Sequence, residues 1–492
     1  MGCFGLGLYG PAVGSPAFGK PVSLSGLLSH ALSLAPLSSA NREAGKAVNE
    51  PPRRAKLSKR NRQAPKQLPG LSEGWHHGPS SAESIGKIST KARDVFMRIA
   101  IDYTTAIRQG AGIGTYIRCL VEALLAQDQV NHYVLLSSQP PQEGRTFPQA
   151  EHVTIRRIPI PERYLNIIWY RWQLPPYANW FTGPVDLYHG PDFVLPPFSR
   201  FGRRPRTVVT IHDLAFLEYP QYAVPSLAAY LREVVPRAAR TADVVATVSQ
   251  ASAHTLTKYL GTPPEKMAII SPGVGRAFRR VTDPVLLEAT RYKYGLKHPF
   301  VLTVGTKEPR KNHLGLIRAF HQALKHKPRP KMLVIVGGPG WLYEETEQEV
   351  VRLGLTEKVR FLGHVSTLDL VMLYSMADVF AYPSFYEGFG MPALEALACG
   401  APVVTSNTSS LPEVVGEAAL KVDPYDVEAL ASAITRLLAD QQLCEELRQK
   451  GFEQAKRYTW EASARKMLLV YQKLYEGLTD FTTLEASYAD RH

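Results

Sequence analysis

The feature that most constrains the fold is an alternation of short buried strands with helices, which occurs twice along the chain. In the first half, strands are predicted at residues 97–103, 133–137, 153–158, 185–189, 207–212 and 243–249. In the second half, they are predicted at residues 300–305, 332–336, 359–362, 379–382 and 403–405. Strands that alternate with helices form parallel sheets covered by helices on both faces. We therefore predict an α/β protein with two doubly wound, Rossmann-like domains.

Length and charge agree with several domains and exclude some functions. A chain of 492 residues is too long for one hydrophobic core. Of its net charge of +13, a balance of +8 lies in residues 1–96, which hold 13 Lys+Arg and 5 Asp+Glu. The body is only mildly basic, so a nucleic-acid function is not expected. The four cysteines form no CxxC pair, and the sequence has no long apolar run, so we expect a cytoplasmic protein.

The composition also divides the chain. Residues 1–96 are rich in Gly, Ser, Pro and Arg without periodicity, which is typical of disorder. Met97 begins directly at the first predicted strand and is a candidate start of the working protein. The predicted parts are a disordered basic extension (1–96), a first Rossmann-like domain (97–275), a linker (276–298), a second Rossmann-like domain (299–458), a terminal helix (459–476) and a tail (477–492).

Residues 384–400 combine a glycine loop, a helix and the start of a buried strand. Gly388 and Gly390 leave room for a ligand to approach the backbone where the helix begins. A helix N-terminus presents free N–H groups and a partial positive charge, which suits a phosphate group. Glu387 lies in the loop and Glu395 about one turn inside the helix, so two carboxylates could contact the two ends of a nucleotide-sugar.

A second candidate site follows the predicted strand at 300–305. The residues Glu-Pro-Arg-Lys-Asn at 308–312 open the next helix. A departing diphosphate accumulates negative charge, which cations must stabilise. Arg310 offers a fork that matches phosphate oxygens and Lys311 a point charge, so this pair is predicted to bind a diphosphate. A solvated basic surface is the alternative for such a pair.

The segment from Glu387 to Glu395 resembles the Glu-x7-Glu signature of glycosyltransferase family 4, a large group of retaining nucleotide-sugar transferases. The resemblance covers about residues 97–475 and implies the GT-B architecture, in which two Rossmann-like domains face a cleft. It implies that the N-terminal domain (97–275) is the acceptor side, that the C-terminal domain (299–458) binds the nucleotide-sugar, and that the terminal helix (459–476) crosses back to the first domain. It implies transfer of a hexosyl group from a nucleoside diphosphate-sugar to a sugar, glycan or lipid-linked acceptor. The sequences around residues 305–312 and 387–392 suggest the mannosyltransferase-like branch, with GDP-mannose as the first donor to test.

The resemblance also implies roles for particular residues. Those at the donor sugar are the catalytic candidates Glu387 and His212. Those at the diphosphate are Arg310, Lys311 and the backbone of Gly388, Phe389 and Gly390. The ribose is assigned to Glu395, the base to the backbone of Val365, and contacts to both donor and acceptor to the glycine loop Gly112, Ile113 and Gly114. No metal and no separate cofactor is expected, because fixed cations would do the work of a divalent ion.

The sequence departs from the family pattern at two positions, and several alternative interpretations of its function are open. Gly275 stands where the family usually has aspartate, and Thr306 where many relatives have arginine. The aromatic and basic stretch 164–175 either contacts a membrane surface or apolar acceptor, or packs as a helix facing the cleft. Peripheral contact with the inner face of the membrane is therefore left open. The alternative functions are a UDP-sugar-dependent transferase of the same fold, a sugar-nucleotide epimerase and a non-catalytic nucleotide-binding protein.

Overall fold

The computed structural model describes residues 96–482 apart from 111, 143 and 328–330. The predicted basic extension therefore lies outside the described residues, except for Phe96. Among the helices of the described part, none combines the length and the apolar character needed to span a membrane.

The first sheet has seven parallel strands in the order β3-β2-β1-β4-β5-β6-β7. The strands are β1 (Arg98–Asp102), β2 (His132–Ser137), β3 (Val153–Arg157), β4 (Leu187–Gly190), β5 (Arg206–Thr210), β6 (Val244–Thr247) and β7 (Met267–Ile269). The prediction that 243–249 is the last strand of the first half is wrong, because β7 pairs with β6. β7 has three residues, which is too short for a recognisable strand pattern.

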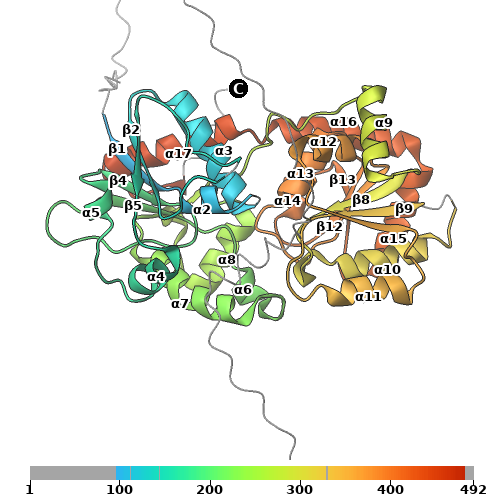
Figure 1. Ribbon diagram of the computed structural model, residues 1–492, viewed down its shortest axis with the longest axis horizontal. Coiled ribbons are helices and arrows are strands. Elements are labelled where there is room, and N and C mark those ends of the chain that lie inside the picture. The colour runs from blue at the N-terminus through green and yellow to red at the C-terminus, as the bar shows by residue number, and fades with distance from the viewer. Residues whose placement is uncertain (1–95, 111, 143, 328–330, 483–492) are drawn as a thin grey trace, which may run out of the picture. The chain divides into compact units, whose positions relative to one another are not determined.

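The second sheet has six parallel strands in the order β10-β9-β8-β11-β12-β13. The strands are β8 (Phe300–Val304), β9 (Met332–Val336), β10 (Val359–Gly363), β11 (Val379–Tyr382), β12 (Val403–Ser406) and β13 (Ala419–Val422). The sequence analysis missed β13, which adds an edge strand beside β12. The prediction of two doubly wound parallel sheets is confirmed (Figure 1).

Helices join the strands in both halves. The first half contains α2 (Thr104–Arg108), α3 (Ile113–Gln127), α4 (Glu162–Leu165), the π-helical turn η1 (Asn166–Arg171), α5 (Asn179–Thr182), α6 (Ala215–Glu218), η2 (Pro220–Tyr222), α7 (Pro225–Thr241), α8 (Gln250–Leu260) and η3 (Pro264–Lys266). The second contains α9 (Pro284–Tyr294), η4 (Pro309–Lys311), α10 (His313–Ala323), α11 (Glu344–Arg352), α12 (Thr367–Met376), α13 (Met391–Ala398), α14 (Leu411–Val415), α15 (Val427–Ala439), α16 (Gln441–Lys456) and α17 (Trp460–Tyr475).

The central strands of each sheet are buried on both faces, as is usual in parallel sheets. β8 reads Phe-Val-Leu-Thr-Val, and its alternate residues belong to different cores: Leu302 packs in one cluster and Val301 in another. Local signals fix where the helices begin. The Asn312 side chain accepts the N–H of Gly315 at 3.1 Å and caps α10. Because the loop from a strand such as β8 to the next helix is short, the residues that follow the strand lie at the carboxyl edge of its sheet.

The helix α17 packs against the first sheet's helix α3, although it lies at the end of the described chain (Figure 1). Its Tyr471 Oη lies 2.7 Å from Nδ1 of His189 on β4. At the start of the helix, a Cβ on Gly273 would lie 2.1 Å from the backbone N of Trp460, so only glycine fits there. The last helix is thus joined to the first sheet by a hydrophobic core, a hydrogen bond and a close backbone approach.

Candidate functional site

The loops after β8, β11 and β12 meet at the carboxyl edge of the second sheet. In open parallel sheets this edge is where ligands bind. The backbone N–H of Phe385, after β11, donates to the carbonyl of Arg310, after β8, at 2.9 Å. The N–H of Glu387 donates to Oγ of Ser409, after β12, at 3.0 Å. Three segments that are distant in sequence therefore form one site.

Glu387 is buried between two cations. Its Oε1 lies 2.7 Å from Nζ of Lys311, and its Oε2 lies 3.0 Å from Nη1 of Arg310. The hydroxyl of Tyr382 also donates to Oε1 at 2.8 Å. Burial opposes ionisation of this carboxyl, but Lys311 and Arg310 outweigh it and lower the pKa of Glu387 to about 2. Glu387 is therefore a carboxylate at neutral pH.

The two cations differ in how their donors are used. Arg310 also donates to Oε1 of Glu308 at 2.5 Å and to the carbonyl of Tyr386 at 2.8 Å, so the protein itself holds its guanidinium. Lys311 has three N–H donors. Two of them reach Glu387 and the hydroxyl of Tyr382, the latter at 2.9 Å. Lys311 thus keeps one donor for an anion beyond its described contacts.

Glu395 has the opposite environment. It lies on α13, where its Oε2 accepts the hydroxyl of Tyr374 at 3.1 Å. Within the described residues it has no ion pair. Glu395 is only half-buried, yet desolvation of a carboxyl without a neighbouring cation raises its pKa to about 8. Glu395 is therefore mostly a neutral carboxyl at pH 7 and can both donate and accept hydrogen bonds.

The structure brings His212 against the loop that contains Gly388. A Cβ on Gly388 would lie 2.5 Å from the carbonyl oxygen of His212, so a side chain is excluded there. The hydroxyls of Ser249 and Ser252 both donate to the carbonyl of Gly388, at 2.7 and 3.1 Å. The ring of His212 lies 2.9 Å through Nε2 from the carbonyl of Pro191, and burial lowers its pKa. This neutral imidazole donates through Nε2 and leaves Nδ1 as an acceptor.

The remaining residues predicted at the diphosphate and base are all buried. Phe389 is buried and packs edge-on against Tyr458. Gly390 adopts φ 102° directly before α13, a conformation that favours glycine. Val365 is buried in the core of the second sheet just after β10. A role of Phe389 and Val365 in binding would therefore use their backbone atoms.

The glycine loop of the first half opens α3. Gly112 is its N-cap with φ 57°, and Ile113 and Gly114 are its first residues. Ile113 packs against the hydrophobic core. A Cβ on Gly114 would lie 2.3 Å from the carbonyl of Gln109, which explains the need for glycine.

The sequence analysis missed two acidic residues, Asp102 and Asp192, at the carboxyl edge of the first sheet. Asp192 accepts the hydroxyl of Thr105 at 2.6 Å, and burial raises the pKa of Asp102 at the end of β1. Glu162 pairs with Arg108 at 2.5 Å. Asp102 ends β1 and Asp192 follows β4, two strands that were predicted, so the rule that ligands bind at carboxyl ends would have identified both residues.

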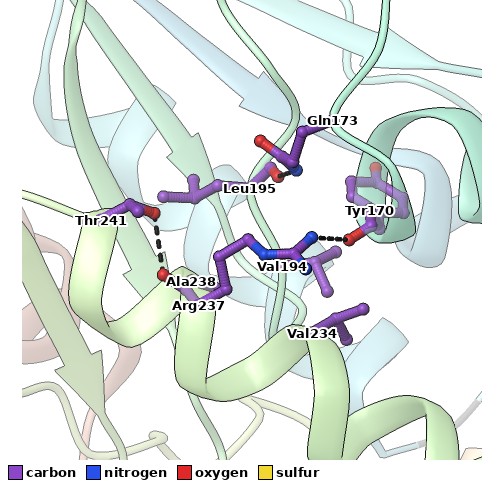
Figure 2. A pocket seen from close by; sticks show the side chains of 8 residues that line it. All are labelled: Tyr170, Gln173, Val194, Leu195, Val234, Arg237, Ala238 and Thr241. Carbon is purple, nitrogen blue, oxygen red and sulfur yellow. Dashed lines mark hydrogen bonds between the residues drawn. The ribbon is translucent and has the colours of Figure 1, made fainter.

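The space drawn in Figure 2 is too small for a substrate. Its volume is about 10 Å³, which holds at most one water molecule. Beside it, Nη1 of Arg237 on α7 donates to the carbonyl of Tyr170 at 3.1 Å (Figure 2). The same atom also donates to the carbonyl of Arg171 at 2.8 Å. These bonds fix part of the aromatic stretch 164–175 on α7.

Two Rossmann-like halves, with cations and a glycine-rich loop at the carboxyl edge of the second sheet, fit the GT-B architecture. The model "Glycosyltransferase Family 4" matches residues 110–277, and "Glycosyl transferases group 1" matches residues 288–454. The chain is 34% identical over 385 residues to O-antigen chain mannosyltransferase B of Escherichia coli, covering 74% of this chain and 96% of that enzyme.

Solved structures of other proteins have a similar fold. Sucrose-phosphate synthase from Thermosynechococcus elongatus is similar with a TM-score of 0.64 and 25% identity, over 77% of this chain and 100% of that one. Anabaena HepE in complex with UDP and glucose has a TM-score of 0.58 and 20% identity over the same shares. The chain belongs to glycosyltransferase family 4, and it is an enzyme that transfers glycosyl groups.

Proposed function

We propose that this enzyme transfers a mannosyl group from GDP-mannose to a sugar, glycan or lipid-linked acceptor, with retention of anomeric configuration. The observation that carries the proposal is the ionised Glu387 between Arg310 and Lys311. It is supported by the 34% identity to a mannosyltransferase over 96% of that enzyme's length.

The proposed reaction needs charge stabilisation at the leaving group. The bond between the anomeric carbon and the β-phosphate oxygen breaks, and a bond to the acceptor hydroxyl oxygen forms on the same face of the sugar. The acceptor proton goes to the departing phosphate. The remaining N–H donor of Lys311 and the opening of α13 would stabilise the charge on that phosphate, in the place of a divalent ion.

In the proposed complex, Glu387 orients the donor sugar by accepting its hydroxyls and stabilises positive charge developing on the ring. His212 contributes a neutral acceptor, Nδ1, to the same sugar. Gly388, Phe389 and Gly390 would contact the diphosphate through their backbone. Glu395 would bind the ribose hydroxyls and the backbone of Val365 the base.

The acceptor is proposed to meet the first sheet. The residues Gly112, Ile113 and Gly114 open α3 there, and Asp102 and Asp192 lie at the carboxyl edge of the same sheet. Carboxylates that accept hydroxyl donors suit a carbohydrate, whereas an anionic acceptor would be repelled.

A donor screen tests the proposal. Purified enzyme is incubated with GDP-mannose, UDP-glucose or UDP-N-acetylglucosamine, with and without free or lipid-linked mannosyl acceptors, and nucleoside diphosphate release is measured. Release should be fastest with GDP-mannose and should survive EDTA. The Glu387→Gln variant should lose at least about 100-fold in rate, which excludes a contaminating activity. No binding of any nucleoside diphosphate in calorimetry would overturn the proposal.

A UDP-sugar donor is the second candidate. The specific observation behind it is that the HepE structure contains UDP and glucose. A preference for UDP-glucose over GDP-mannose in the same screen would favour this alternative and leave the roles of Glu387 and Lys311 unchanged.

We also propose that residues 164–180, from α4 to α5, contact the membrane surface. Trp169 and Tyr170 are buried there, but Trp172 and Trp180 are 61% and 63% exposed, and Tyr164 and Ile167 are 47% and 42% exposed. Exposed aromatic side chains beside basic residues suit the interface of an anionic membrane. Co-sedimentation with vesicles containing anionic lipid should therefore weaken in the Trp172→Ser variant, and equal binding of that variant and the wild type would contradict the contact.

A further inference from the structure

A hollow of about 250 Å³ lies next to the Glu387 loop but is not among the predicted binding sites. Its walls come from α6, α8 and the loops after β11 and β12. The lining side chains that matter here are Glu218, Tyr219, His254, Thr255, Tyr386 and Ser409. Pockets for drug-sized ligands measure roughly 300–1,000 Å³, so this hollow suits one small ring.

The hollow begins one residue from the proposed donor site. Tyr386 precedes Glu387, and Ser409 accepts the backbone N–H of Glu387 through its Oγ at 3.0 Å. Ser409 has φ 54°, a left-handed conformation that is uncommon for serine and typical of functional loops. A ligand in the hollow would therefore lie close to the reacting donor without occupying its place.

The hollow also contains a carboxylate with unused acceptor capacity. Oε1 of Glu218 lies 3.4 Å from Nζ of Lys258. Oε2 of Glu218 is buried and accepts no hydrogen bond from the described residues. Because Oε2 has almost no accessible surface, a ligand hydroxyl would meet this carboxylate at Oε1, whose contact with Lys258 is long.

A row of aromatic rings leads from the hollow to the surface. The rings of Tyr386 and Tyr219 are 5.5 Å apart, and those of Tyr219 and Tyr222 are stacked at 5.9 Å. Tyr222 stacks on Phe385 at 5.1 Å, and Phe385 lies 4.7 Å from Tyr425, which is 61% exposed. Within the row the stacked rings cover one another's faces, so the aromatic lining of the hollow itself is Tyr219 beside the buried Tyr386.

We propose that the hollow is a carbohydrate subsite, separate from the site of transfer, that binds one sugar ring of a glycan acceptor. A pyranose has apolar faces and hydroxyl edges, which match aromatic rings beside a carboxylate. The carboxylate of Glu218 disfavours a phosphate group. The inference rests on the proposed function and makes it specific: the acceptor is an oligosaccharide chain rather than a monosaccharide or a small polyol.

The test compares acceptors of increasing length. Wild-type enzyme is assayed with its donor and free manno-oligosaccharides from the monosaccharide upward, and kcat/KM is determined for each. We expect kcat/KM to rise with length by roughly tenfold, the effect of one well-packed aromatic contact. In Tyr219→Ala and Glu218→Gln this rise should be lost. Tyr292→Ala removes a 91% exposed tyrosine on α9 and is the matched control, which should keep the rise.

The outcomes separate this inference from the proposed function. If the enzyme releases nucleoside diphosphate but Tyr219→Ala keeps the full length dependence, the subsite is wrong and the proposed function stands. If no nucleotide-sugar is used, calorimetric titration of the oligosaccharides into the wild type and Tyr219→Ala decides the subsite alone. Weaker binding by Tyr219→Ala supports it, and equal or absent binding overturns it.

Discussion

Glu387 and Glu395 are the same residue type eight positions apart, and the protein keeps one charged and the other neutral. Glu387 lies in the loop after β11, where Lys311 and Arg310 contact both of its oxygens. Glu395 lies on α13, where its described polar contact is the hydroxyl of Tyr374. The comparison shows that neighbours, and not residue type or position in a motif, decide what a carboxyl group can do.

The charged Glu387 and the neutral Glu395 suit two different kinds of contact with a substrate. A permanent carboxylate can stabilise positive charge that develops on a sugar ring in the transition state. A neutral carboxyl can share hydrogen bonds with two hydroxyls of a ribose, in the ground state and the transition state alike. Contacts of the first kind affect turnover, and contacts of the second kind affect binding.

The largest effect should come from removing the cation that keeps Glu387 charged. In Lys311→Met, we expect kcat to fall by about 100- to 1,000-fold, the range for losing one electrostatic group at a developing charge. The pKa of Glu387 should also rise, because its burial would be less compensated. The acid limb of the pH profile of kcat/KM should therefore lie at higher pH than in the wild type.

The control is Lys421→Met, which removes a lysine paired with the exposed Glu417. This variant should behave as the wild type in both rate and pH profile. A Lys311→Met enzyme with wild-type turnover, or one that is slower without any shift of the acid limb, would show that Glu387 does not depend on this cation.

Most of the fold could be predicted from the sequence, because buried parallel strands such as β8 are continuous apolar runs between glycine loops. The strands that were missed lack this signal. β7 has three residues, and β13 reads Ala-Leu-Lys-Val with only its first residue buried. Both lie at sheet edges, and pairing with a neighbour, which the sequence does not reveal, defines them.

The candidate site was predictable only in part. Local motifs indicated Glu387, Arg310 and Lys311 separately, because each lies beside a glycine loop or a helix start. Their mutual ion pairs join residues more than 70 positions apart and depend on the order of β8 and β11 in the sheet. The raised pKa of Glu395 and the row from Tyr386 to Tyr425 likewise follow from tertiary packing.

A smaller effect should follow from removing the carboxyl group of Glu395. In Glu395→Ala, we expect the Kd for GDP to rise by about tenfold, since a lost hydrogen bond costs roughly 0.5–1.5 kcal/mol. At saturating donor, kcat should change by less than about threefold, because the contact is shared by the ground and transition states. Calorimetry and steady-state kinetics check the two values. A large fall in kcat with unchanged Kd would mean that the roles of Glu387 and Glu395 are exchanged.

The smallest effect concerns stability and pH in the ligand-free protein. The pKa of Glu395 is about 8 in the native state and about 4.3 in the unfolded chain. Between these values the native state holds a proton that the unfolded chain has lost, so the free energy of unfolding falls as pH rises through this window. Glu395→Gln cannot ionise and should escape this fall. Its melting temperature should therefore gain on that of the wild type from pH 5 to pH 9, by about 2–4 °C for each 1 kcal/mol. The Glu428→Gln variant, altered at an exposed position on α15, should show no such gain. A constant difference between Glu395→Gln and the wild type across this range would show that Glu395 is ionised in the native state, and the contrast with Glu387 would not hold.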